Sequence, residues 1–110
     1  MRAFPIAKAL VASTPSSESS VFFPFPGTTP SVSANGSANA IVWAAANNDP
    51  AVLYAYDAGN LTHELYDSNQ AANGRDHFGT GNKFITPTIA HGKVYVGTTN
   101  GVGVFGLFGR

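Results

Sequence analysis

Three observations predict that this 110-residue chain is an all-β protein. With 12 glycines and seven prolines, and many Ala, Ser, Thr and Asn residues, its composition suits a β protein with many turns better than a helical one. Its apolar runs have the length of strands and are bounded by turn residues. The same order of strands and turns also occurs twice along the chain. At this length we expect one small domain.

The first part of the chain predicts little regular structure. Phe4–Ser13 fits a short strand or a marginal helix. From about Thr14 to Pro30 the prolines fix φ and remove backbone donors, so we expect a connector rather than a central strand. Phe22, Phe23 and Phe25 are too apolar for a solvated linker. Part of this connector is therefore expected to pack against the rest of the domain.

The remainder predicts seven short antiparallel strands. The first ends in Asn35-Gly36, where Gly can take the positive φ that tight turns need. The second is a continuous apolar run, typical of strands covered on both faces. In the fourth, Leu61, His63 and Leu65 alternate onto one face. The predicted strands are residues 31–34, 40–47, 51–57, 61–67, 84–90, 93–98 and 102–107.

These strands form two unequal copies of one unit. "PSVSANG…AIVWAAAN…VLYAYDAGN" corresponds to "PTIAHG…KVYVGTTN…VGVFGLFG", beginning at Pro30 and Pro87, 57 positions apart. Internal repeats of about 40 to 50 residues are typical of propellers and solenoids. The sequence thus predicts an incomplete β-propeller of about two antiparallel blades. Its parts are a remnant of a preceding blade with a Pro-rich connector (1–30), a complete four-stranded blade (31–67), a polar loop (68–82) and a three-stranded blade (83–110).

The second copy resembles a known family. "TPTIAHGKVYVGTTNGVGVFGL" is similar to the closing segment of quinoprotein-like β-propellers, whose repeats are named after pyrroloquinoline quinone. "PSVSANGSANAIVWA" and "AVLYAYDAGNLTHELYDS" resemble the preceding blade, and "FPIAKALVASTPSS" resembles the outer strand of a further one. The resemblance covers roughly residues 4 to 107. It implies the C-terminal fragment of such a propeller, in which the last blade lacks its outer strand and Met1 is an internal position of a longer parent.

The resemblance extends to the fold rather than to the cofactor. Quinoprotein blades often carry a Gly followed by a Trp after the outer strand, whereas the one Trp here, Trp43, falls inside a strand. No position matches the Asp base, the calcium-binding carboxylates or the cofactor-binding residues of the quinoprotein dehydrogenases. The sequence therefore predicts no catalytic, cofactor-binding or metal-ligating residue and no cofactor, and the function remains a separate question.

The composition limits the kinds of partner that this chain is expected to bind. Six basic and six acidic residues leave no net charge, and no basic stripe of the kind that binds nucleic acid is present. No apolar run approaches the roughly 20 residues of a membrane helix. Without cysteines there are neither disulfides nor thiolate chemistry. The family is usually found outside the cytoplasm, but Pro5 and Lys8 make the N-terminus a poor signal peptide, so the compartment is not predicted.

The three histidines are the first candidates for chemistry. His91 precedes Gly92 as Asn35 precedes Gly36, which predicts a turn former. His63 is expected in the outer strand, half-buried. His77 follows Arg75 and Asp76, and only a loop conformation could gather these three side chains. The structural interpretation is preferred for all three.

Several polar and glycine-rich motifs also have structural explanations. Asp57 and Asp67 are expected to accept hydrogen bonds from backbone N–H groups in Asx-turns. "GTGN" (79–82) and "GVGVFG" (101–106) lack the context of phosphate-binding loops, so we expect turns and tight strand packing. The serines of residues 13–20 have no partner His at a recognisable spacing.

Three functions remain open at this point. The first is a structural and interaction scaffold with no catalysis, whose open strand edges would pair with the rest of a propeller or with another chain. The second is the C-terminal part of a quinoprotein oxidoreductase. The third is a carbohydrate-binding module, which needs exposed aromatic side chains. Five aromatic residues are predicted to fill the space between blades instead: Trp43, Tyr54, Tyr56, Tyr95 and Phe105.

Overall fold

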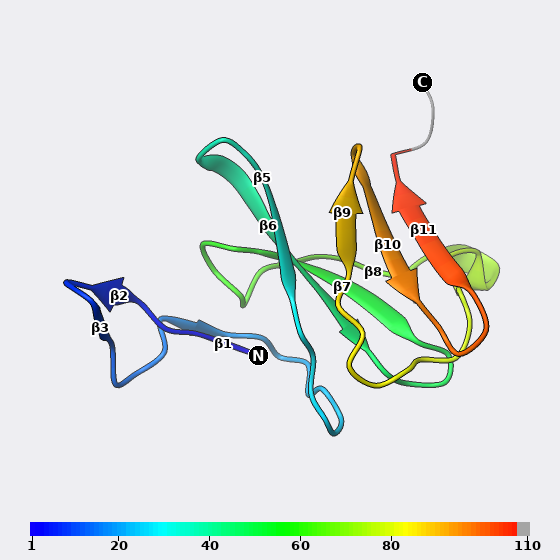
Figure 1. The fold of residues 1–110 in the computed structure, drawn as a ribbon, viewed down its shortest axis with the longest axis horizontal. Helices are drawn as coiled ribbons and strands as arrows, with labels where there is room; N and C mark the ends of the chain where they lie inside the picture. Colours follow the sequence, from blue (N-terminus) through cyan, green and yellow to red (C-terminus); the bar gives the residue numbers. More distant parts are fainter. Residues whose placement is uncertain (108–110) are drawn as a thin grey trace.

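The computed structural model, described here for residues 1–107, is all-β and confirms several antiparallel sheets. The largest is a four-stranded sheet of β5 (Ser31–Asn35), β6 (Ala38–Ala46), β7 (Val52–Asp57) and β8 (Glu64–Asp67), in that spatial order. Beside it lies a three-stranded sheet of β9 (Thr88–Ala90), β10 (Lys93–Gly97) and β11 (Val102–Gly106), in the spatial order β11-β10-β9 (Figure 1). The predicted blade 83–110 includes residues 108–110, which lie outside the described part.

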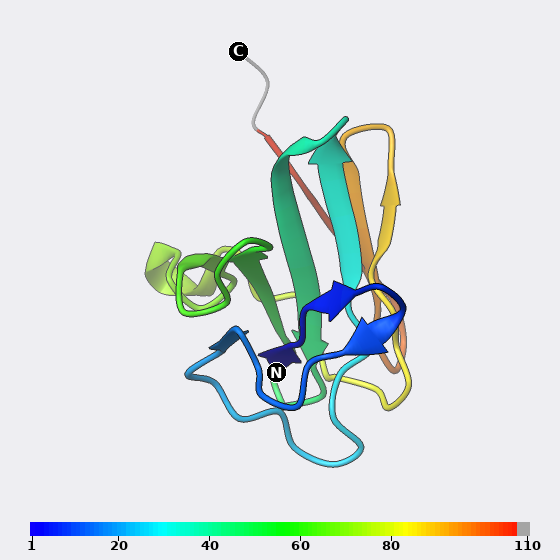
Figure 2. The ribbon, with the colours of Figure 1, turned by 90° about the vertical axis from the view of Figure 1, so that its left-hand side faces the viewer.

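The N-terminal residues form a separate layer of short strands. β1 (Arg2–Ala3) pairs with β4 (Ser17–Glu18), and between them β2 (Ile6–Ala7) and β3 (Leu10–Val11) form a small hairpin. The two open possibilities for Phe4–Ser13 are thus resolved in favour of strand. Figure 2 shows this layer in front of the larger sheets.

Each of the two larger sheets has one face toward the N-terminal layer, here called its N-side face, and an opposite C-side face. The N-side face of the four-stranded sheet packs against the N-terminal layer, and Tyr56 and Ala44 are fully buried there against Phe23. Its C-side face packs against the N-side face of the three-stranded sheet, where Leu53 is fully buried beside Val96. The four-stranded sheet is therefore the middle of three layers. This burial explains the apolar run in β6, as expected for a strand covered on both faces.

Hydrogen bonds of serine side chains hold the layers together. The Ser17 hydroxyl accepts from the backbone N–H of Leu61 at 3.0 Å, which ties the N-terminal layer to the four-stranded sheet. The Ser31 hydroxyl donates to the carbonyl of Pro87 and joins the first strands of the two repeats. Ser68 is fully buried, and its Oγ accepts from the N–H of Leu53 at 3.1 Å. The Ser17 and Ser31 bonds join neighbouring layers, and the Ser68 bond ties the residue after β8 to β7 within the four-stranded sheet.

The pairing registers allow the strands of the two predicted copies to be aligned by position. Ser31 and Thr88, the residues after the two repeat prolines, pair with Trp43 and Tyr95. On the next strand, Trp43 pairs with Ala55 just as Tyr95 pairs with Val104. Two residues beyond Trp43 and Tyr95, Ala45 pairs with Leu53 and Gly97 pairs with Val102. Leu53 therefore corresponds to Val102.

Two predicted strands begin later than expected. The predicted 61–67 strand starts at Glu64, because Leu61 and Thr62 form a turn closed by the Asn60 carboxamide, whose Oδ1 accepts from the N–H of Thr62 at 3.1 Å. The predicted 84–90 strand starts at Thr88, after Phe84 with a positive φ of 62° and after Pro87, which has no N–H for a ladder.

The expected alternation in the fourth strand is also wrong. Leu61 is buried in the core, but Leu65 is 44% exposed and His63 lies in the turn before the strand, exposed to solvent. A β-bulge between Ala55 and Tyr56 shifts the register on which that alternation relied.

In the connector, one of the three phenylalanines packs and two do not. Phe23 is buried at 9% exposure and its ring meets Tyr54 edge-on, with centroids 5.6 Å apart. Phe22 and Phe25 remain 85% and 78% exposed. The expectation that part of the connector packs is confirmed, and Phe23 is the residue that does so.

We predict that Leu53→Ala lowers the free energy of unfolding by about 2 to 5 kcal/mol, because a fully buried Leu leaves a cavity between two sheets. Leu65→Ala, on the exposed side of β8, is the matched control and is expected to cost less than about 1 kcal/mol. Urea unfolding followed by circular dichroism measures both. Equal losses would contradict the layered core.

Candidate functional site

The histidine candidates lie in three separate places. His91 has a φ of 48° and Gly92 a φ of 71°, so both form the two-residue turn between β9 and β10, as predicted. Its proposed counterpart differs: Asn35 ends β5, and the turn itself is formed by Gly36 and Ser37. The Nδ1 atom of His63 lies 3.7 Å from the Asp57 carboxylate, and both side chains of this contact are exposed.

Both predicted Asx-turns are confirmed. The Asp57 carboxylate accepts from the N–H of Gly59 at 2.8 Å. The Asp67 carboxylate accepts from the N–H of Asn69, also at 2.8 Å. These bonds stabilise the turns before and after β8.

The loop cluster of Arg75, Asp76 and His77 is only partly gathered. Arg75 Nε donates to the Asp76 carboxylate at 2.7 Å, and the two side chains form an ion pair. The His77 ring lies beside Gly74 instead, where a Cβ would come within 2.9 Å of its Nδ1 atom. Gly74 also has a φ of 63°, so this bend needs glycine for two reasons.

Tyr66 completes this cluster, and sequence reasoning missed it. Its hydroxyl donates to the Asp76 carboxylate at 2.7 Å, from a strand ten residues earlier. The Arg75 and Tyr66 hydrogen bonds lower the pKa of Asp76 to about 2. Burial and the bond to Asp76 raise the pKa of Tyr66. The lowered pKa keeps Asp76 ionised, and the raised pKa keeps Tyr66 protonated. The cluster is therefore suited to fixing the loop rather than to transferring protons.

A second polar cluster lies across β7 and β8. The Tyr56 hydroxyl donates to the Glu64 carboxylate at 3.3 Å. Burial raises the pKa of Glu64, and the neighbouring Asp67 carboxylate raises it further. Burial, followed by the charge of Glu64, also raises the pKa of Tyr56. The sequence signal for this pair was the β8 motif "ELYD", but only the bulged register brings Glu64 opposite Tyr56.

The glycine-rich motifs pack closely, as predicted. A Cβ on Gly81 would come within 2.5 Å of the Asn47 Cα atom, and a Cβ on Gly103 within 2.6 Å of the Phe78 ring. Neither distance leaves room for a side chain. Gly81 N–H also donates to the carbonyl of Asn48 at 2.8 Å, so this motif closes the loop against β6.

Four of the five aromatic side chains predicted to fill the space between blades lie between layers, and the prediction is wrong for Tyr95. Tyr56 is fully buried on the N-side face, where Tyr54 stacks on it with a centroid distance of 6.1 Å. Trp43 is half-buried at the C-side face and donates from Nε1 to Ser33 Oγ at 2.8 Å. Phe105 meets Phe78 edge-on at 5.0 Å. Tyr95 lies on the C-side face of its own sheet, away from the other two layers.

The C-side face of the three-stranded sheet is uncovered. Val102 and Val104 are 63% and 55% exposed on it, and Tyr95 is half-buried between them and β9. The corresponding residues of the four-stranded sheet, Leu53 and Ala55, are 0% and 1% exposed. The same apolar face is thus covered in one copy and uncovered in the other.

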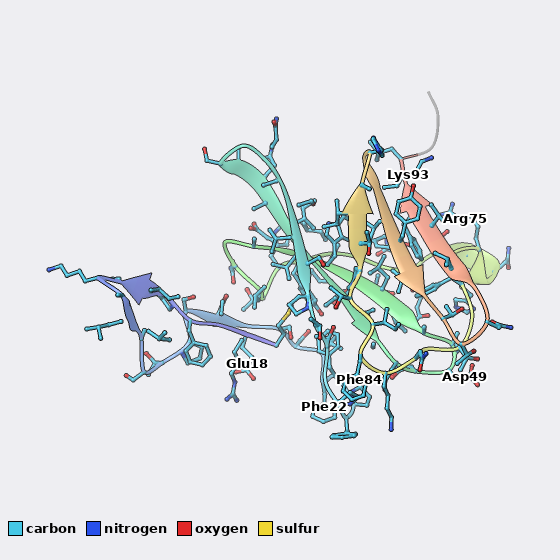
Figure 3. The ribbon with its side chains drawn as sticks, in the orientation of Figure 1. Glu18, Phe22, Asp49, Arg75, Phe84 and Lys93 are labelled. Atoms are coloured by element: carbon cyan, nitrogen blue, oxygen red, sulfur yellow. The ribbon has the colours of Figure 1, made fainter. Side chains whose placement is uncertain are left out.

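The edge of this sheet is uncovered too. In the four-stranded sheet, β8 pairs along β7, whereas β11, which corresponds to β7, is the last strand of its sheet within residues 1–107. An edge strand with no proline and few charges can accept another strand. Figure 3 labels Lys93, the first residue of β10.

Other classes of site find little support in the described residues. Among them, no group of three or more His, Asp or Glu side chains converges as metal ligands would. The same residues form no helix long and apolar enough to cross a membrane. Searches of family models, of curated proteins and of solved structures each found no match for this chain.

We predict that Tyr66→Phe raises the pKa of Asp76 from about 2, because one of two hydrogen bonds to its carboxylate is lost. Carboxyl ¹³C shifts followed between about pH 1.5 and pH 6 measure this pKa. Tyr95→Phe, which leaves Asp76 untouched, is the control. An unchanged pKa would show that Arg75 alone holds the carboxylate.

The lowered pKa of Asp76 also predicts how the stability of the fold changes with pH. A folded pKa below the unfolded value of about 3.9 means that Asp76 stabilises the fold above that pH, and that this contribution is lost as pH falls toward about 2. Asp76→Asn is therefore expected to flatten the acid side of the stability curve measured by urea unfolding.

Proposed function

We propose that this chain is a structural and interaction scaffold without catalysis of its own, and that its sheets are blades of an incomplete, quinoprotein-like propeller. The single observation that carries the proposal is the difference between the two copies. Val102 and Val104 are exposed where Leu53 and Ala55 are buried. A face built to be covered, and left uncovered, is the usual mark of an interaction surface.

The stacking of the layers supports the propeller part of the proposal. Each larger sheet turns its N-side face toward the layer that precedes it along the chain. Repetition of one face-to-face junction is what a propeller or a solenoid requires, because every unit contacts only its neighbours. The repeated register from Pro30 and Pro87 supports the same interpretation.

The polar clusters favour a structural over a catalytic role. Asp76 has two hydrogen-bond donors on its carboxylate, and Glu64 accepts from a buried tyrosine. Both groups therefore stabilise loops and strands around β8. In the described residues, no observation favours the oxidoreductase alternative or the carbohydrate-binding alternative over the scaffold.

The proposal predicts that the β11 edge accepts an added strand. A ten-residue peptide with the sequence of residues 60–69 contains β8 and its flanks, the segment that occupies this position in the other copy. Added to the full chain, it is expected to slow hydrogen exchange of the outward amides of Val102–Gly106, with a scrambled peptide as control. Protection confined to β5, or none at β11, would contradict the strand-acceptor role.

A second measurement separates the scaffold from the enzyme. The full chain, titrated with pyrroloquinoline quinone in the presence of calcium, is expected to show no saturable binding by calorimetry. Saturable binding at one site would instead support the oxidoreductase alternative.

A further inference from the structure

The β-bulge in the four-stranded sheet brings two carboxylates onto one face of β8. Residues three apart in a regular strand point to opposite faces, which would separate Glu64 from Asp67. Leu65 is the extra residue of the bulge, and as a result Glu64 pairs with Tyr56. Asp67 pairs with Tyr54, and residues directly opposite each other share a face. Both carboxylates therefore lie on the N-side face, where the two tyrosine rings stack.

The surroundings of Glu64 disfavour its charged form. Its side chain is half-buried, and its carboxylate accepts from the Tyr56 hydroxyl at 3.3 Å. Burial raises the pKa of Glu64, and the hydrogen bond and the negative charge of Asp67 raise it further. The Tyr56 hydrogen bond lowers this pKa but is outweighed. Glu64 thus binds a proton more readily in the paired strand than it would in water.

The charged groups on the elements around β8 are tied to partners of their own. They are the Arg2–Glu18 and Arg75–Asp76 ion pairs, the His63–Asp57 contact, and the Met1 ammonium group on the Ser19 hydroxyl. The raised pKa values of Tyr54 and Tyr56 keep both phenols protonated near neutral pH. Since histidine ordinarily changes its charge between about pH 5 and 8, His63 is the group whose titration must be separated from that of Glu64.

We propose that Glu64 and Asp67 form a pH-sensitive clasp for β8, which stays paired with β7 while Glu64 carries a proton and loosens when that proton leaves. The step is the reversible release of one proton to solvent, and no other covalent bond changes. Opening the strand moves both carboxylates into water, so ionisation favours the open form. Release of β8 leaves β7 as an edge strand, the position of β11 in its own sheet (Figure 1). The clasp does not depend on the proposed scaffold function.

The direction of the pH dependence follows from the raised pKa of Glu64. In the open strand this carboxyl has an ordinary pKa of about 4.3, and in the paired strand a higher one. Its contribution to pairing is therefore complete below about pH 4.3 and is lost as the pH rises through the folded-state pKa. Asp76 acts in a separate range, because its contribution is lost only below about pH 3.9.

Hydrogen exchange measures the opening of β8 directly. The amides of Asp57 and Ser68 each donate across the boundary between β7 and the β8 segment at 3.0 Å. Between about pH 4 and 8, after correction for intrinsic rates, their protection factors are expected to fall about threefold or more. The amide of Ala58, which donates to Ala40 on β6, is the internal control and is expected to change less. An equal fall at Ala58, or no fall at Asp57 and Ser68, would overturn the clasp.

Two variants separate Glu64 from the neighbouring histidine. Glu64→Gln keeps an acceptor for the Tyr56 hydroxyl but cannot ionise, so it is expected to retain the low-pH protection of both amides across the whole range. His63→Gln removes the adjacent titratable ring and is the matched control, expected to keep the pH dependence of the unaltered chain. A pH dependence that persists in Glu64→Gln, or disappears in His63→Gln, would contradict the role of Glu64.

A third variant tests the contribution of Asp67. Asp67→Asn keeps an acceptor for the N–H of Asn69 but removes the second charge. It is expected to reduce the pH dependence without abolishing it, because burial of Glu64 is the larger cause of the raised pKa. Circular dichroism checks that all three variants fold. A pH dependence equal to that of the unaltered chain would show that Glu64 acts alone and would overturn the paired clasp.

Discussion

The whole structure depends on burying both faces of one four-stranded sheet. Tyr56 and Leu53, three positions apart on β7, lie on opposite faces of this sheet, and both are fully buried. Removing water from apolar side chains is the dominant favourable contribution to folding, and a small domain has little of it. A chain of 110 residues that contains much alanine can therefore fold only if a layer covers each face. The N-terminal layer and the three-stranded sheet supply these covers.

The same requirement explains why the polar residues gather around β8. This strand lies at the edge of the central sheet, where Glu64 and Tyr66 have backbone on only one side. Their side chains are tied instead to Tyr56 and to Asp76. Arg75 and the Asx-turns at Asp57 and Asp67 then fix the loops on either side. Residues that resemble an acid–base site in the sequence thus secure an edge strand.

The repeated unit also accounts for what is left uncovered. A sheet with two apolar faces needs a covering layer on each face. Within residues 1–107, no further layer covers the C-side face of the three-stranded sheet. Apolar side chains are also uncovered in the N-terminal layer, where the β2–β3 hairpin exposes Ile6 and Leu10. Stacked repeats commonly need a cap or a partner at each end for this reason. The proposed scaffold role follows from this stacking rule.

The sequence by itself determined the strands, their turns and their repetition, because these depend on local alternation and on Gly, Pro, Asn and Asp at turn positions. It placed the turn at His91-Gly92 and the Asx-turns correctly. It misplaced the starts of β8 and β9, where a bulge and a positive φ at Phe84 override the local pattern. Only the tertiary structure decided that Phe23 packs while Phe22 does not, that Tyr66 meets Asp76, and that Val104 is exposed while Ala55 is buried. These outcomes depend on which layer faces which, and contacts between residues far apart in the chain leave no periodic signal in the sequence.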